Sequence, residues 1–327
     1  MFEHCVPIYR LLISCIQFHG KTYIMFLLLF LSSIPLLLAA GNEDDWGYRD
    51  HNGPDSWGGS CQSGLAQSPI DVRMKDVDYA VLHRLHFVHY DHPGKIEVLN
   101  NGHTLTASGF DKWEAKQPYI QGGGLKHKYK LVQFHLHWAS HDHHGSEHKI
   151  GGLHYPAELH LVHLRSDLTL QQAVSKPDGL AVVGVFILIE HDASPMAALD
   201  KVIEEVVAPN NRTNLFGFRT RPMLPQSTDS FYRYEGSLTT PPSCAESVIW
   251  TLLAEPISMT RHQMTALRRL QATDMKPMGH NWRPTQPLNG RRVLFRPAQF
   301  DRSILCPSSS AIIVTLTSFI FSLVSLL

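Results

Sequence analysis

The segment Leu131-Val132-Gln133-Phe134-His135-Leu136-His137-Trp138 alternates apolar and polar side chains. A period of two predicts a β-strand, on which successive side chains point to opposite faces. Gln133, His135 and His137 would share one face. Two imidazoles at positions i and i+2 have Cα atoms about 7 Å apart and can reach one metal ion. The opposite face would pack in a core and would carry Val132, Phe134, Leu136 and Trp138.

A second segment, residues 157–163, alternates in the same way. His160 would complete a three-histidine site and leave the fourth coordination position of zinc open, which is typical of catalytic zinc. Glu158, His160 and Val162 would share the face of the site. The other face would carry Leu159, Leu161 and His163.

The same faces supply partners for the ligands. A ligating histidine usually donates its second ring N–H to a carboxylate, an amide or a carbonyl. Gln133 lies beside His135 in the pattern, and Glu158 lies beside His160. A lone His-x-His pair is more often two surface residues, but the third histidine and the two partners favour a metal site. The histidines of residues 141–144 fall in a polar loop and are interpreted as solvated.

The remainder of the chain indicates one domain rich in short strands. Scattered Gly and Pro predict many turns, and no repeat or linker interrupts the sequence. Residues 180–189 are almost continuously apolar and fit a central strand. Helical periodicity is confined to residues 196–207 and 262–270. We expect a mainly β (α+β) domain over residues 41–300, with short peripheral helices.

Both ends of the sequence are apolar. Residues 25–40 read MFLLLFLSSIPLLLAA and predict a signal peptide cleaved after Ala40, so that residues 1–40 form a leader; Met25 is an alternative start. Residues 311–327 are apolar and follow small residues, which predicts an anchor signal over residues 301–327. Seventeen residues are short for a spanning helix, so a GPI anchor is favoured over a plain tail anchor.

Composition narrows the class of protein further. Lys+Arg and Asp+Glu both total 29, and a chain without net charge is not expected to bind nucleic acid. Asn211-Arg212-Thr213 is a glycosylation sequon, expected on a surface loop. Cys61, Cys244 and Cys306 lie outside the leader, and an exported chain can bridge the first two.

Ordered blocks of the sequence, from Trp46 to about Phe295, resemble the alpha-class carbonic anhydrases. They include Trp46-Gly47-Tyr48, Gln67-Ser68-Pro69-Ile70, the two histidine segments, Ser237-Leu238-Thr239-Thr240-Pro241-Pro242 and Asn281-Trp282-Arg283-Pro284. The resemblance implies a central, mostly antiparallel, ten-stranded twisted sheet. It also implies one Zn²⁺ at the base of a cleft. The reaction implied is reversible hydration of carbon dioxide to bicarbonate and a proton through zinc-bound hydroxide, for which this family is the standard example.

The resemblance also assigns roles to single residues. Thr239 would accept a hydrogen bond from the hydroxide, and Glu147 would accept one from Thr239. His103 would export the proton, and Asn281 would support the ligands from behind. The wall of the substrate pocket would consist of Val162, Val182, Leu238, Thr240, Val248 and Trp250.

The cysteines and the apolar ends resemble the exported, membrane-anchored branch of the family. Cys61 and Cys244 match the disulfide positions of that branch, although residues 242–246 are one residue longer than usual. We therefore expect a monomer at the extracellular face that contacts the membrane through a C-terminal lipid anchor or tail. Its partners would be carbon dioxide and bicarbonate.

Two other classes compete with this interpretation. A cupin-type oxygenase would need a glutamate a few residues after the histidine pair, whereas Glu147 is ten residues after His137. A non-enzymatic relative that only binds would have lost a zinc ligand, and this sequence keeps all three.

Overall fold

The computed structural model describes residues 15–18, 21–24, 46–191 and 194–298. The chain forms two units, Met1–Asn42 and Glu43–Leu327. In the first unit, β1 (Cys15–Phe18) pairs antiparallel with β2 (Lys21–Ile24). Strands β1 and β2 fall within the predicted leader of residues 1–40, whereas its apolar stretch of residues 25–40, the predicted anchor signal and Cys306 lie outside the described residues.

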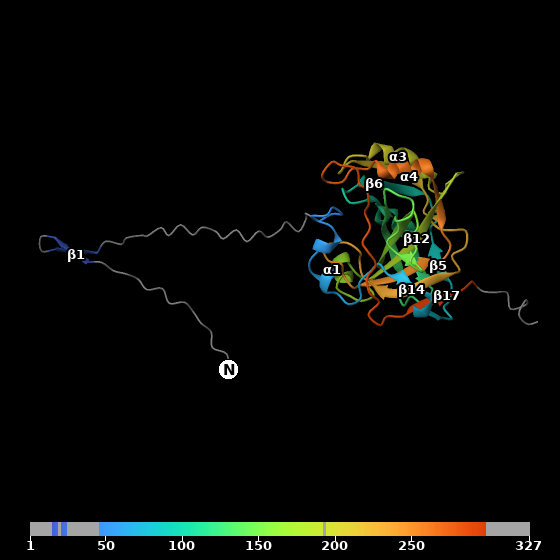
Figure 1. Cartoon of the computed structure of the whole chain (residues 1–327), viewed down its shortest axis with the longest axis horizontal. Coiled ribbons are helices and arrows are strands. Elements are labelled where there is room, and N and C mark those ends of the chain that lie inside the picture. Colours follow the sequence, from blue (N-terminus) through green and yellow to red (C-terminus); the bar gives the residue numbers. More distant parts are fainter. Residues whose placement is uncertain (1–14, 19–20, 25–45, 192–193, 299–327) are drawn as a thin grey trace, which may run out of the picture. The chain divides into compact units, whose positions relative to one another are not determined.

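The second unit is built on one large sheet, shown in Figure 1. Ten strands follow one another in the order β13-β6-β7-β9-β11-β12-β15-β14-β17-β4, and β5, β8 and β16 join at the side. Strands β3 (Asp71–Val72) and β10 (Lys149–Ile150) form a separate parallel pair. The strands of the large sheet are β4 (Val77–Tyr79), β5 (Leu85–Val88), β6 (Gly94–Asn100), β7 (Leu105–Ser108), β8 (Tyr119–Gly122), β9 (Tyr129–Trp138), β11 (Ala157–Arg165), β12 (Leu180–Glu190), β13 (Arg212–Phe218), β14 (Phe231–Gly236), β15 (Val248–Leu253), β16 (Ile257–Thr260) and β17 (Val293–Arg296).

Most strand pairs in this sheet are antiparallel. Within the described part of this sheet, the parallel pairs are β12 with β15, β12 with β16, and β17 with β4. The apolar run predicted as a central strand is β12, which is buried along most of its length. The predicted mainly β domain with a large, mostly antiparallel sheet is therefore confirmed. The prediction was a ten-stranded sheet; the sheet has thirteen strands, of which ten follow one another in one continuous order.

Short helices surround the sheet. Residues 196–207, predicted as one helix, form a 3₁₀ turn followed by α3 (Asp200–Glu205). The second predicted helix is α4 (Arg261–Arg268), which begins at a capping box made by Thr260 and Gln263. Helices α3 and α4 lie side by side (Figure 1), and Gln263 of α4 donates a hydrogen bond to Asp200 of α3. The other helical segments are α1 (Ser60–Ser63), α2 (Leu170–Ala173), and the 3₁₀ turns Pro54–Ser56, Met74–Asp76, Phe110–Lys116, Ala197–Leu199 and Arg221–Met223.

None of the helices within residues 46–191 and 194–298 combines the length and the apolar character that crossing a bilayer requires.

The two faces of the sheet bury different apolar clusters. Phe134, Leu136 and Trp138 of β9 belong to the larger cluster, as predicted. Val132 does not: it packs against the smaller cluster on the opposite face. The prediction for Val132 was wrong because β9 contains a β-bulge, in which Gln133 pairs with Val162 but the next pair joins Leu131 to His163. The extra residue at a bulge breaks the regular alternation of side chains.

The disulfide expected between Cys61 and Cys244 is present, with Cα atoms 5.0 Å apart. It lies in a small apolar cluster with Tyr48 and Trp57. The bridge joins residues 183 positions apart, and closing a loop in the unfolded chain stabilises a fold by about 2–4 kcal/mol. It fastens the N-terminal segment of this unit to the loop that follows Thr239.

Candidate metal centre

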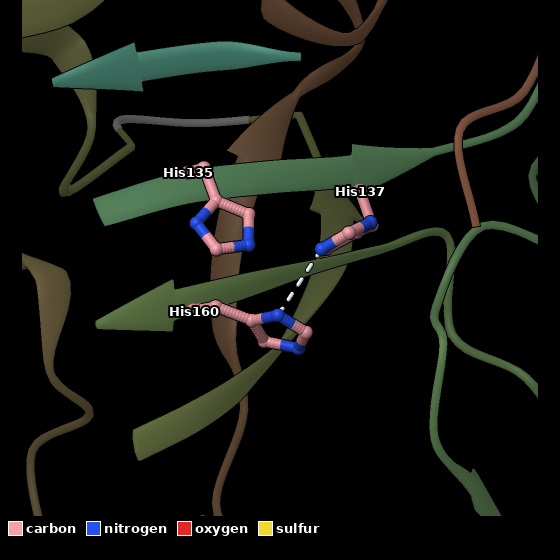
Figure 2. Close-up of side chains that lie close together, drawn as sticks. All are labelled: His135, His137 and His160. Atoms are coloured by element: carbon pink, nitrogen blue, oxygen red, sulfur yellow. Dashed lines mark hydrogen bonds between the residues drawn. The ribbon is translucent and has the colours of Figure 1, made fainter. Parts of the chain in front are cut away.

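Two neighbouring strands carry the three predicted ligands. His135 and His137 lie on β9 and His160 on β11, and the antiparallel register sets His160 directly opposite His135. Figure 2 shows the three imidazoles turned toward one another on the same side of the strands. One ring nitrogen from each histidine lies within 4.8 Å of the other two. His137 and His160 are buried, whereas His135 is partly exposed, so solvent reaches the group from the side of His135.

The outer nitrogen of each ring faces an oxygen that accepts a hydrogen bond. Nδ1 of His135 lies 2.9 Å from Oε1 of Gln133. Nδ1 of His137 lies 2.7 Å from the backbone oxygen of Asn281. In the third ring, Nε2 of His160 lies 2.8 Å from Oε1 of Glu158. Each outer nitrogen therefore donates, which fixes the tautomer and leaves the inner nitrogen of a neutral ring with a lone pair.

These inner nitrogens fit a single zinc ion. Nε2 of His137 and Nδ1 of His160 are only 3.1 Å apart, drawn as the dashed line in Figure 2. Both protons of the pair are already committed to the outer nitrogens, so the two lone pairs need a cation between them. Burial and the neighbouring imidazoles hold the pKa of His135 well below its usual range, and burial also lowers the pKa of His137. Neutral imidazole is the form that ligates zinc.

A buried carboxylate anchors the ligand on β11. Burial alone would raise the pKa of Glu158, but His148 and His160 hold it well below its usual range. Oε2 of Glu158 accepts from the backbone N–H of His148 at 2.8 Å, and Oε1 lies 2.7 Å from Nδ1 of the same residue. Nε2 of His148 lies 2.6 Å from the hydroxyl of Tyr234, which ties the group to β14. His148, Glu158 and His160 form a second cluster of possible metal ligands. Because nitrogens of both histidines face the Glu158 carboxylate, we interpret this cluster as a hydrogen-bond network.

Glu147 lies behind the ligands. Its Oε1 accepts from the backbone N–H of Arg283 at 2.9 Å, and its Oε2 is buried without a hydrogen-bond partner in the described residues, 3.9 Å from Nδ1 of His160. Thr239 is 5% exposed, and no hydrogen bond joins it to Glu147 in the described part of the chain. The role of this pair remains a prediction.

The predicted substrate wall lies on the same face as the ligands. Val162, Val182, Val248 and Trp250 belong to one buried cluster, and Leu238 packs against it; Thr240 is partly buried in the adjacent loop. The ring centroids of Trp250 and His160 are 4.8 Å apart. The structure thus gathers these residues into an apolar surface beside the histidines.

His103 lies in the loop between β6 and β7. Its backbone oxygen accepts from Nδ2 of Asn281 at 3.1 Å, which links the loop to the segment that supports His137. The imidazole stacks on Trp46, with ring centroids 3.9 Å apart and planes within 8°. Burial lowers the pKa of His103. The residue also lines a cavity of about 320 Å³ together with His51 and His280.

Three residues that support the metal centre could not be assigned a role from the sequence: His148, Tyr234 and Arg283. Arg283 is 2% exposed and donates to Gln67 and Ser68 at 2.8 Å and to the backbone oxygen of Cys61. In the sequence, Arg283 stood out only as part of the family-like block that contains Asn281. Tyr234 and Arg283 contact residues far away in the chain, so local periodicity could not predict these contacts.

The fold and the site define a class of protein: a β-sheet protein in which three histidines of two neighbouring strands converge in the arrangement typical of a catalytic zinc site. Residues 52–297 match the eukaryotic-type carbonic anhydrase family. The chain belongs to that family and is an enzyme of the carbonic anhydrase class.

Several curated relatives agree with this assignment. "Putative carbonic anhydrase 5" of Caenorhabditis elegans is 53% identical over 297 residues, which cover 89% of this chain and 96% of the relative. "Putative carbonic anhydrase 3" of the same species is 40% identical over 76% of this chain and 96% of the relative. Carbonic anhydrase 3 of Equus caballus is 38% identical over 76% of this chain and 97% of the relative.

Proposed function

We propose that this chain hydrates carbon dioxide reversibly to bicarbonate and a proton, with one Zn²⁺ held by His135, His137 and His160. The observation that carries the proposal is the convergence of three inner ring nitrogens whose outer nitrogens are all engaged as donors. When bound, zinc supplies the Lewis acidity that makes water acidic near neutral pH. Gln133, Glu158 and the backbone of Asn281 orient the rings.

We also propose a direction for the hydrogen bonds that join Glu147, Thr239 and the attacking water. An ionised carboxylate only accepts, so Glu147 would receive the proton of the Thr239 hydroxyl. The Thr239 oxygen is then left to accept from the attacking water, which turns a lone pair of that water toward the substrate. The buried, unpaired Oε2 of Glu147 supports this arrangement because a buried polar atom is normally hydrogen-bonded.

Carbon dioxide is apolar, and the buried wall of Val162, Val182 and Trp250 offers it a surface from which water is excluded. His103 would take the released proton and pass it to solvent. An imidazole suits this task because its pKa lies near neutrality.

Metal analysis and a hydration assay on the purified full-length chain test the proposal. We expect one zinc per chain and hydration of carbon dioxide well above the uncatalysed rate. Iron in place of zinc would favour an oxygenase, and a zinc-loaded chain without hydration activity would favour a binding module.

His103→Ala is expected to slow turnover in weak buffer by on the order of 10²-fold, the lower end of what a positioned general acid–base contributes. The rate of the zinc-loaded variant should recover in part when imidazole is added, because free imidazole can carry the proton. Stopped-flow measurement of carbon dioxide hydration checks both effects. Unchanged turnover in weak buffer would remove His103 from the mechanism.

The pH profile supplies a control for His103. The residue accepts a proton only when it is neutral, and burial against Trp46 lowers its pKa. The part of turnover in weak buffer that depends on His103 should therefore decline, as the pH falls, at a lower pH than an imidazole with an ordinary pKa would give. Trp46→Ala exposes the ring, so its pKa should rise and the decline should begin at higher pH. The same substitution in a His103→Ala background should leave the profile unmoved.

We also propose that the enzyme is exported and acts as a monomer at the extracellular face, held by a GPI anchor. The buried disulfide between Cys61 and Cys244 supports export, because such bridges persist in oxidising compartments. Asn211 is exposed immediately before β13, where its sequon would be accessible for glycosylation.

Phosphatidylinositol-specific phospholipase is expected to release the enzyme from intact cells into the medium. The measurement is the carbonic anhydrase activity in the supernatant before and after treatment, with a high-salt wash as the control for loosely bound protein. Retention on the cells after phospholipase treatment would point to a plain tail anchor.

A further inference from the structure

A buried arginine lies on the face of the sheet opposite the metal ligands. Arg233 is on β14, and the next residue on the same face, Phe231, belongs to the larger apolar cluster. Its chain neighbour Tyr234 points the other way, toward the cluster that contains Trp250. A site at Arg233 would therefore be separated from the metal centre by the thickness of the sheet.

The guanidinium of Arg233 has unused hydrogen-bonding capacity. The residue is 6% exposed; its Nε donates to Oγ1 of Thr251 at 3.1 Å, and its Nη2 is buried without a partner in the described residues. A nearby carboxylate, Asp178, is occupied by Arg165 at 2.6 Å and His127 at 3.2 Å. A buried charge normally has a counter-ion, because burying it alone is costly.

Burial lowers the pKa of Arg233 to about 10, which still leaves the side chain charged at neutral pH. A bound anion would supply the charge partner that the described residues do not provide.

Arg233 lines a cavity of about 400 Å³ beside β14 and β17, two strands that pair in the sheet and are labelled together in Figure 1. Four basic and two acidic side chains line this β14–β17 cavity, so the basic charges exceed the acidic ones by two. Gly124 forms another part of the wall, where an added Cβ would lie 3.7 Å from Nη1 of Arg233. Apolar lining comes from Leu82, Ile249 and Leu294.

We propose that the β14–β17 cavity binds a small organic anion, with a phosphate or carboxylate head at Arg233 and a compact apolar body against Leu82 and Ile249. The head would contact Nη1 of Arg233, the guanidinium nitrogen that lies beside the Gly124 wall of the cavity, because Nε is engaged with Thr251. Lys126, exposed at the same cavity, adds positive charge without an ion-pair partner in the described residues. The lining of this cavity contains none of the three histidine ligands, so the proposed anion site does not depend on the proposed catalytic function; the lining does include Tyr234, whose hydroxyl lies 2.6 Å from Nε2 of His148.

Calorimetric titration of the zinc-loaded, full-length enzyme with phenyl phosphate and with benzoate, at constant ionic strength, tests this proposal. We expect one molecule of at least one probe to bind per chain. Arg233→Gln should weaken binding by roughly 10- to 100-fold, as expected for hydrogen bonds to a charged group. Lys126→Glu changes only an exposed side chain and should weaken binding in the same direction, so the test survives a folding defect in the arginine variant.

Two controls separate this site from other sources of binding. Arg212→Gln removes an exposed arginine at the opposite end of the strand order and should leave the affinity unchanged. His135→Ala disables the metal centre and should also leave it unchanged. The proposal is overturned if neither probe binds, if Arg212→Gln weakens binding as much as Lys126→Glu does, or if binding vanishes in His135→Ala and persists in Arg233→Gln.

Discussion

Replacement of His135 by alanine is expected to reduce carbon dioxide hydration to the uncatalysed rate and to leave the purified enzyme without its zinc. Two imidazoles remain in this variant, and they cannot supply the three protein ligands that a catalytic zinc requires. His135 is partly exposed, so its removal opens no sealed cavity in the core and the fold should persist. Metal analysis, stopped-flow hydration and circular dichroism measure the three outcomes.

His141→Ala provides the matched control for that experiment. His141 is exposed and lies in the polar loop that follows β9, so its loss should change neither zinc content nor rate. Removing zinc from the unsubstituted enzyme with a chelator should reproduce the loss of activity, and added zinc should restore it. A His135→Ala enzyme that retained both zinc and full activity would refute the proposed ligand set.

Glu158→Gln is expected to lower both the zinc affinity and the free energy of unfolding, and this is the second largest effect that we predict. The carboxylate accepts from His160 and twice from His148, and all three residues are buried. An amide offers one acceptor oxygen in place of two and no charge. Loss of such a supporting partner typically weakens metal binding by about 10- to 100-fold. Loss of a hydrogen bond to a buried charged group costs about 1.5–3 kcal/mol in the free energy of unfolding.

Zinc competition with a chromophoric chelator measures the first effect, and urea unfolding measures the second. Glu97→Gln is the control, because Glu97 is partly exposed and its ion pair with Arg212 spans 3.7 Å. Wild-type zinc affinity in Glu158→Gln would show that the carboxylate does not orient His160.

Local periodicity was sufficient to predict the ligand-bearing strands. Strands β9 and β11 pair antiparallel, with their polar faces on the same side of the sheet. The register that brings His160 opposite His135 could not be read from either strand alone. Register depends on the pairing of the entire sheet and on its turns.

Contacts between distant segments account for most of what the sequence did not reveal. The oxygen that accepts from His137 belongs to a residue 144 positions away, and only the family resemblance pointed to that segment. The hydrogen bonds from His148 to Tyr234 and from Arg283 to Cys61 span 86 and 222 positions. Arg233 gave no signal either, since an arginine in an alternating strand is usually exposed, whereas here it is buried.

The bulge in β9 determines where this strand can lose or gain a residue. Val132 is the residue without a counterpart on β11, while Leu131 and Gln133 on either side keep their own partners. Deleting Val132 would restore a regular ladder and leave every later side chain on its present face. Deleting or inserting a single residue between Gln133 and His137 would instead move the side chains of part of the strand to the opposite face of the sheet. At least one imidazole would then point into the apolar core. Natural insertions and deletions in this strand should therefore concentrate at the position of Val132.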